Sequence, residues 1–439
     1  MRRNHRLREI ALIGTIGLTG ACQGSLTDQL RDAIAEQRIE PLDHGRRPDE
    51  DLVALGEALF YDKELSGNRD VSCGTCHHPA SRTGDGLSLS IGTGGVGVGT
   101  DRQLGSGNYL LRNAPDLFDR GADGWETLFW DGRIELGEPW PLPDGVTMPT
   151  AIGDDLLAAQ VMTQIAHRDT MRGYPGDVDV DGTTNSHANN DDNALPVIWE
   201  AVMARLLAID EYVALFADAF PDVPRAELGF EHAALAISAY QVGAFSLPNS
   251  QWDRFIEGED GALVDAAKRG GILFYGDARC GECHSGTLMT DQDFHNVCTP
   301  QVGTGLDWGR GGYTGLASER YAFRTPPLRG VSFTAPYFHA GTHRSLEELV
   351  EYHIDPCTQM RTYTGEDLEP RFQQLLVSQE ELFAEIEQTA DPIAQSPINL
   401  SREEIADIVQ FLESTSDPDV VWDITTIAPA SVPSGRPVD

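Results

Sequence analysis

Two copies of the pentad Cys-x-x-Cys-His are the feature that most constrains what this chain can fold into; they occupy residues 73–77 and 280–284. Two thiols at this spacing can bond to the two vinyl groups of one porphyrin, and the histidine that follows can bind its iron. A four-cysteine zinc site would leave both histidines unexplained, and a redox disulfide motif is not expected twice. The pentads therefore predict two covalently attached haem groups of c type, held by Cys73, Cys76 and His77 and by Cys280, Cys283 and His284.

The N-terminus predicts export. Residues 2–8 are rich in arginine, and residues 10–21 form a short apolar stretch of mainly small and aliphatic side chains. This pattern is typical of a secretory signal and is too short for a spanning helix. Cys22 follows a sequence that resembles a lipoprotein processing site, so a lipid anchor at Cys22 is an option. We expect residues 1–22 to be an export signal and the protein to work in the periplasm, where covalent haem attachment takes place.

Two cysteines remain after the pentads and Cys22, namely Cys298 and Cys357. In an oxidising compartment a disulfide between them is the simplest expectation. The alternative is a pair of buried free thiols.

Charge narrows the choice of partners. The 439 residues include 69 acidic and 32 basic side chains, which gives a formal net charge of −37. Nucleic acids and anionic lipid surfaces would repel such a chain, whereas a small basic redox protein would be attracted to it. The alternative is that the acidic side chains serve only to keep the protein soluble.

Apolar spacing predicts helices and almost no strands. Residues 51–60, 196–220, 225–245 and 403–412 carry apolar side chains three or four positions apart, and glycine-rich connections separate them. Residues 58–61 lead into the first pentad as residues 272–275 lead into the second, a weak internal repeat. We expect an all-α fold of two cytochrome c-like haem domains with long irregular loops. The expected order is a polar tether (23–48), an N-terminal haem domain (49–250), a C-terminal haem domain (251–425) and a tail (426–439).

Several ordered motifs around the pentads resemble those of the bacterial dihaem cytochrome c peroxidase family, which includes a maturation enzyme that oxidises tryptophans to build a quinone cofactor. The resemblance covers most of residues 50–415 and rests on the segments LFYD (59–62), RNAP (112–115), FWDGR (129–133), FRTPPLR (323–329) and TAPYFH (334–339). It implies that the N-terminal haem reacts with peroxide and the C-terminal haem passes electrons. It also implies a calcium ion and a tryptophan between the two haems.

The resemblance assigns roles to individual residues. Trp130 matches the bridging tryptophan, and Gln160 matches a glutamine that handles peroxide. The calcium ion would be bound by the Asn113 side chain and by the main-chain carbonyls of Thr334 and Pro336, oxygen donors that suit a hard cation.

The second haem is expected to have His353 as its distal ligand. In the family a methionine or tyrosine stands fourteen positions after the histidine that matches His339, and here that position is His353. A capping box at residues 345–348 starts a helix whose apolar face would include His353. The alternatives for this ligand are Met289, Met360 and Tyr352.

Two positions at the first haem depart from the family pattern. Thr93 stands where the peroxidases have a distal histidine, sixteen residues after the haem histidine, so this iron is expected to keep an open site. Thr170 stands where the family has a glutamate, ten residues after Gln160. Because a threonine cannot move peroxide protons at neutral pH, either Asp169 or His167 substitutes or peroxide turnover is slow.

Together these patterns predict an exported dihaem oxidoreductase that reduces hydrogen peroxide. Its electrons would come through the second haem from a small cytochrome c or a cupredoxin. One alternative is a peroxide-driven oxidase that modifies a tryptophan or tyrosine of a protein substrate. The other is an electron carrier without enzymatic activity.

Overall fold

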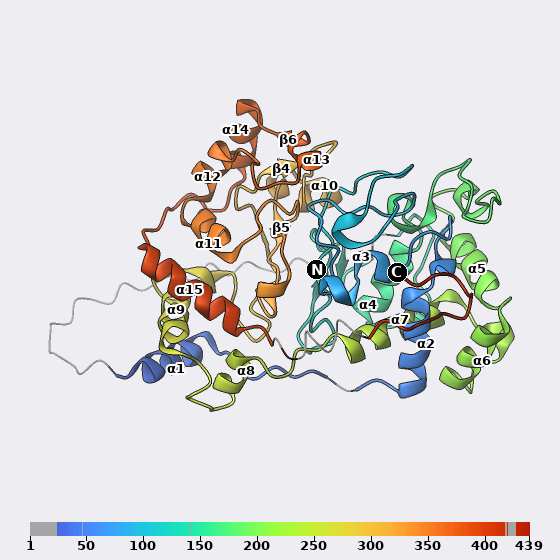
Figure 1. Ribbon diagram of the computed structural model, residues 1–439, viewed down its shortest axis with the longest axis horizontal. Helices are drawn as coiled ribbons and strands as arrows, with labels where there is room; N and C mark the ends of the chain where they lie inside the picture. The colour runs from blue at the N-terminus through green and yellow to red at the C-terminus, as the bar shows by residue number, and fades with distance from the viewer. Residues whose placement is uncertain (1–23, 46, 141, 418, 420–426) are drawn as a thin grey trace.

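The computed structural model describes residues 24–45, 47–140, 142–417, 419 and 427–439, and these form a mostly helical protein with two halves side by side (Figure 1). The export signal and Cys22 lie outside the described residues. The helices longer than eight residues are α1 (Leu26–Gln37), α2 (Glu50–Tyr61), α4 (Leu156–Gln164), α5 (Leu195–Leu206), α6 (Asp210–Ala219), α7 (Phe230–Ala244), α9 (Asp265–Tyr275), α11 (Leu346–Ile354), α14 (Glu380–Gln388) and α15 (Arg402–Ser414). The shorter ones are α3 (Cys73–Cys76), α8 (Gln251–Ile256), α10 (Arg310–Thr314), α12 (Pro356–Thr362) and α13 (Pro370–Gln373).

Strands are few in the part of the chain that the structure describes. Three antiparallel pairs of two residues each join β1 (Thr127–Leu128) to β2 (Ile134–Glu135), β3 (Phe294–His295) to β5 (Phe323–Arg324), and β4 (Gln301–Val302) to β6 (Leu376–Val377). The expectation of a mostly helical protein is therefore confirmed. The stretch 196–220 forms two helices, because α5 ends at Leu206 and α6 starts at Asp210.

The N-terminal half is built on the crossing of α2 and α7. A Cβ atom placed on Gly56 would lie 1.9 Å from the Ala236 carbonyl oxygen, so only glycine lets the two backbones approach this closely. Around the crossing, Leu55, Leu59 and Phe60 of α2 pack into the largest apolar core of the protein.

The C-terminal half repeats this construction with α9 and α15. A Cβ on Gly270 would lie 1.9 Å from the Asp407 carbonyl oxygen, so Gly270 has the same role in α9 that Gly56 has in α2. Phe274 follows Gly270 at the same distance in sequence as Phe60 follows Gly56, and it packs with Phe411 of α15 in a second core. The weak repeat in the sequence thus corresponds to two similar helix crossings. The division of the chain into two haem domains near residue 250 remains a proposal.

The two ends of the described chain cross over to the opposite halves. Within the segment expected to be a tether, α1 is a capped helix whose Leu30 is fully buried against α9 in the C-terminal half. Residues 427–439 lie along the N-terminal half, where Arg436 bonds Glu64 at 2.5 Å and Asp181 at 2.6 Å. Asp439 contacts Lys63 and Thr75, the latter inside the first pentad.

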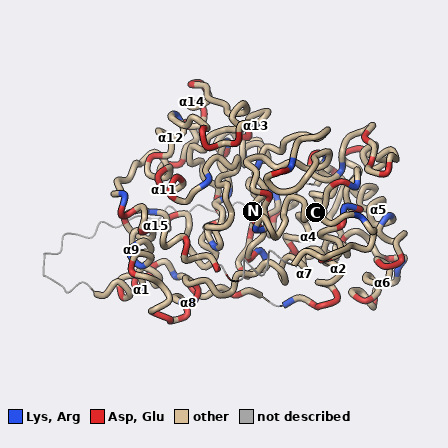
Figure 2. Tube along the Cα trace, viewed as in Figure 1, with Lys and Arg blue, Asp and Glu red and all other residues tan. Residues whose placement is uncertain are grey.

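No helix among the described residues is long and apolar enough to cross a membrane. Aspartate and glutamate are spread over both halves of the molecule (Figure 2).

A disulfide joins Cys298 and Cys357, as expected from the cysteine count. Cys298 is fully buried in a cluster with Tyr352 and Met360, so the bond ties the chain after the second pentad to α12. We expect the double substitution Cys298→Ser and Cys357→Ser to lower the free energy of unfolding by about 3–4 kcal/mol in denaturant titrations, because the bond closes a long loop in the unfolded chain. Two alkylatable thiols in the unreduced, denatured protein would contradict this expectation.

Candidate haem sites and the wall between them

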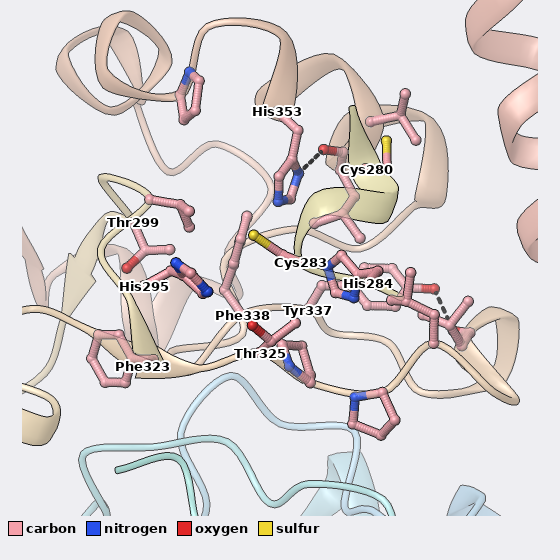
Figure 3. A pocket seen from close by; sticks show the side chains of 18 of the residues that line it. Cys280, Cys283, His284, His295, Thr299, Phe323, Thr325, Tyr337, Phe338 and His353 are labelled. Carbon is pink, nitrogen blue, oxygen red and sulfur yellow. Dashed lines mark hydrogen bonds between the residues drawn. The ribbon is translucent and has the colours of Figure 1, made fainter. Parts of the chain in front are cut away.

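The second pentad opens onto a largely apolar cavity of about 230 Å³ in the C-terminal half (Figure 3). Cys280, Cys283 and His284 line it from the pentad, and His353 points into it from α11. The capping box that starts α11 is present, with Ser345 and Glu348 bonding each other's backbone N–H, and it sets the phase that turns His353 inward. Leu349 and Val350 complete this wall.

Two of the histidines that line this cavity, His284 and His353, are oriented by backbone carbonyl oxygens. Nδ1 of His353 lies 2.7 Å from the Leu349 carbonyl oxygen, and Nδ1 of His284 lies 3.2 Å from that of Met289. A carbonyl oxygen can only accept, so Nδ1 carries the proton in both rings and Nε2 keeps its lone pair. Burial lowers the pKa of His353 and lowers that of His284 to about 4, so both rings are neutral at neutral pH. Neutral Nε2 atoms are suitable ligands for iron.

The three alternative ligands do not line this cavity. Met289 and Met360 are buried in apolar clusters, and the Tyr352 hydroxyl donates to the Cys298 carbonyl at 2.5 Å.

The first pentad lines a larger cavity of about 820 Å³ in the N-terminal half. Cys73, Cys76 and His77 contribute to its wall, and Nδ1 of His77 lies 3.0 Å from the Thr83 carbonyl oxygen. Burial also lowers the pKa of His77. His77 therefore offers a neutral Nε2, as His284 and His353 do.

Both pentads are packed in the same way. A Cβ on Gly74 would lie 2.6 Å from the ring of Tyr61, and a Cβ on Gly281 would lie 2.7 Å from the ring of Tyr275. Tyr61 ends α2 and Tyr275 ends α9, so each pentad rests on the helix that precedes it. This repeated contact fixes the two cysteines of each pentad at the edge of a cavity, as covalent attachment of a porphyrin requires.

Thr93, at the family position of the distal histidine, is turned away from the first cavity. Its hydroxyl donates to Asp70 at 2.8 Å and accepts from the Asn68 amide at 3.0 Å, and it is not among the residues that line the cavity. The glycine-rich loop that contains it is fixed by the buried Arg102, which donates to the carbonyl oxygens of Ile91, Gly92 and Gly97.

Gln160 lines the first cavity from α4, as the resemblance implied. Gln164, His167, Asp169 and Thr170 line it from the end of α4 and the π-helical turn Arg168–Arg172 that follows. The hydroxyl of Thr170 donates to backbone carbonyl oxygens of Gln164 and His167, which leaves it no proton for a ligand.

Trp130 stands in a wall that the two cavities share. Six residues line both cavities, and they are Asn113, Pro115, Asp116, Arg120, Trp130 and Arg324. The Trp130 indole N–H donates to the Asn113 carbonyl at 3.1 Å, which fixes the ring in this wall. A tryptophan here lies on the short route between the two cavities.

Arg324 makes the shared wall suitable for haem carboxylates. Its guanidinium is buried and bonds only carbonyl oxygens, those of Phe129 and Thr325, and burial lowers its pKa to about 9. Nη1 of the neighbouring Arg120 is buried without a hydrogen-bond partner among the described residues. Arg120 bonds Asp116 through Nη2, whereas Arg324 has no carboxylate partner among the described residues. A buried cation without such a partner is costly, and the propionates of a haem group would supply one to Arg324 and an acceptor to Nη1 of Arg120. The residues present therefore fit haem in both cavities.

The residues expected at the calcium ion are brought together. Asn113, Thr334 and Pro336 all line the second cavity. The amide nitrogen of Asn113 donates to the Leu87 carbonyl at 2.7 Å, which leaves its side-chain oxygen for another partner.

Two features of these sites had little signal in the sequence. His167 was named only as one of two possible substitutes for the missing glutamate, and the structure places it in the first cavity wall, where α4 gives way to the π-helical turn. Arg324 belongs to the segment FRTPPLR (323–329), which supported only the resemblance to the peroxidase family. Its place between the cavities follows from the pairing of β3 with β5.

Fold and site together define a protein with two pentad-lined cavities, each suited to a covalently bound haem, and a tryptophan between them. A sequence model described as "Di-haem cytochrome c peroxidase" matches residues 50–261. The methylamine utilization protein MauG of Methylorubrum extorquens is 31% identical over 305 residues, covering 69% of this chain and 68% of that protein. The cytochrome c551 peroxidase of Pseudomonas aeruginosa is 29% identical over 334 residues, covering 74% and 76%.

Solved structures agree with the fold. A MauG-like protein associated with microbial copper homeostasis superposes with a TM-score of 0.61 at 24% identity, covering 89% of this chain and 97% of that one. The chain belongs to the dihaem cytochrome c peroxidase family, of which MauG is a member. It is an oxidoreductase, and two haem groups of c type are the cofactors that its family implies.

Proposed function

We propose that the protein reduces hydrogen peroxide at the first haem with electrons that arrive through the second. The observation that carries this proposal is the difference between the two cavities. In the second, His353 and His284 both present a neutral Nε2, so the iron would be ligated on both sides and would only pass electrons. In the first, His77 is the pentad ligand and Thr93 is turned away, which leaves one side for peroxide.

The haem in the first cavity would supply the electron transfer to peroxide, and the protein would position the substrate. Gln160 lines the cavity with a side chain that makes no hydrogen bond to other described residues, so its amide is free to bind and orient peroxide. Trp130 would carry electrons across the shared wall, because it lines both cavities. Asn113, Thr334 and Pro336 would hold a calcium ion beside this route.

We further propose export to the periplasm, with the option of a lipid anchor at Cys22. A small cytochrome c or a cupredoxin with a basic face would be the electron donor, because the net charge of −37 favours such a partner.

The test is steady-state peroxide turnover with a reduced small cytochrome, comparing the wild type with Trp130→Phe. We expect the wild type to turn over peroxide and Trp130→Phe to be slower by about tenfold or more, since each tenfold loss requires only about 1.4 kcal/mol in the barrier. Peroxide binding at the first haem should be unchanged in the variant. No turnover with any reduced cytochrome or cupredoxin would overturn the proposal.

A second candidate is supported by the similarity to the methylamine utilization protein MauG. In this case the electrons would come from a tryptophan or tyrosine of a protein substrate by the same route through Trp130. Peroxide-dependent modification of a partner protein, in the absence of any small electron donor, would distinguish it from the peroxidase.

A further inference from the structure

The first cavity contains a histidine that the expected roles leave unused. His167 lines the cavity at the end of α4, next to Gln160 and Gln164, and its ring has no hydrogen-bond partner among the described residues. Its position is set by its backbone, because the His167 carbonyl accepts from the N–H groups of Met171 and Arg172 at 3.0 Å in the π-helical turn.

The other ionisable side chains of this cavity are already engaged. Asp169 accepts hydrogen bonds from the Asn108 amide at 2.8 Å and the Tyr174 hydroxyl at 2.7 Å. Asp116 accepts from the Phe118 N–H and from Arg120, and His77 is oriented as the pentad ligand. The arginines that line the cavity bond carboxylates or backbone carbonyls; they are Arg112, Arg120, Arg133 and Arg324.

We propose that His167 is the acid–base residue of the first haem site, replacing the glutamate for which this chain has Thr170. This inference rests on the proposed peroxidase function and assigns its proton transfers. A residue with this role must reach the substrate and exchange a proton with it. His167 lines the cavity in which peroxide would bind, and an imidazole is a side chain suited to that exchange.

Hydrogen peroxide accepts two electrons and two protons and gives two water molecules. His167 takes the proton of the oxygen nearer the haem and gives it to the farther oxygen, which leaves as water when the O–O bond breaks. A reduced small redox protein supplies the two electrons through the second haem, and solvent supplies the two protons of the second water.

The charged groups around His167 decide in which pH range it acts. Burial is the main influence and lowers its pKa, Arg133 and Arg172 lower it further, and Asp169 raises it. The ring is therefore neutral, and able to accept a proton, at neutral pH. His167 stops acting as a base when its ring is protonated. This happens as the pH falls through the pKa of His167, which lies below the ordinary histidine value of about 6.5.

Cyanide binding tests this role without peroxide or an electron donor. Hydrogen cyanide must lose its proton to bind ferric haem, so a cavity base accelerates its association. We expect the association rate at the first haem to fall in acid with one inflection below about pH 6.5 in the wild type. In His167→Gln the rate should be about a hundredfold lower and the inflection should be absent. Asp169→Asn, in the same turn, should keep the fast rate at neutral pH, and its inflection should move to lower pH, because the Asp169 carboxylate raises the pKa of His167.

A rescue separates a chemical role from a structural one. Thr170→Glu, placed in the His167→Gln background, should restore fast association, because it returns a carboxylate to the same wall of the cavity. His167→Asn serves as a second variant if His167→Gln does not fold with full haem content. Wild-type rates and an unchanged inflection in either folded variant would overturn the role of His167. The failure of the proposed function would be seen separately, as absence of peroxide turnover in the wild type.

Discussion

Replacing His353 with Ala should convert the second haem from a six-coordinate low-spin centre to one that binds added ligands such as imidazole. The expectation follows from the cavity, in which His353 and His284 each present a neutral Nε2 and none of Met289, Met360 and Tyr352 lines the wall. Covalent attachment should survive, because Cys280 and Cys283 are unaffected. The measurement is the electronic and electron paramagnetic resonance spectrum of the oxidised protein, with haem content as the check on folding.

His353→Met gives the complementary result. Sulfur ligation should introduce the methionine-to-iron charge-transfer band and raise the potential by on the order of 0.1–0.2 V, within the roughly 0.8 V range that axial ligands span. Tyr352→Phe is the matched control on the same helix, since its hydroxyl bonds the Cys298 carbonyl and it does not line the cavity. An unchanged low-spin spectrum in His353→Ala would show that His353 is not the ligand.

The first haem should be high-spin in the resting ferric protein and should react with peroxide without prior reduction of the second. Thr93 cannot ligate the iron from where it lies, because Asp70 and Asn68 hold its hydroxyl outside the cavity and Arg102 fixes its loop. The measurement is stopped-flow spectroscopy of the fully oxidised protein mixed with peroxide, beside a sample whose second haem has been reduced. We expect similar rate constants for the two samples.

Low-spin iron at both haems in the resting protein would contradict this expectation. Since His167 lines the same cavity, His167→Gln would then be the next variant to examine. Its conversion to a high-spin form would identify His167 as an iron ligand, and the acid–base role assigned to it would be wrong.

Local patterns carried most of what the sequence could predict. The pentads, the capping box at Ser345 and the helices around the haem sites depend on neighbours within a few residues, and the structure contains all of them. The disulfide followed from counting cysteines, because only two were left to pair.

Features that depend on distant contacts could not be predicted in the same way. The packing of α1 on α9 and of residues 427–439 on the N-terminal half joins segments at opposite ends of the sequence. The place of His167 in the cavity wall could not be predicted, because the π-helical turn that starts after it departs from the regular helix that hydrophobic periodicity assumes. The roles of Gln160, Trp130 and the calcium residues remain predictions.

The segment 427–439 also has a consequence for how the protein matures. Ser434 bonds Asp62 at 2.6 Å, Asp439 contacts Thr75, and the His78 ring lies 2.9 Å from the Asp439 carbonyl oxygen, so this segment covers the outer side of the first pentad. A chain that is exported N-terminus first, as proposed, would present Cys73 and Cys76 in the periplasm before these residues arrive. The pentad would then be uncovered while the rest of the chain crosses, which would give the haem-attaching machinery its access before the last segment closes over the finished site.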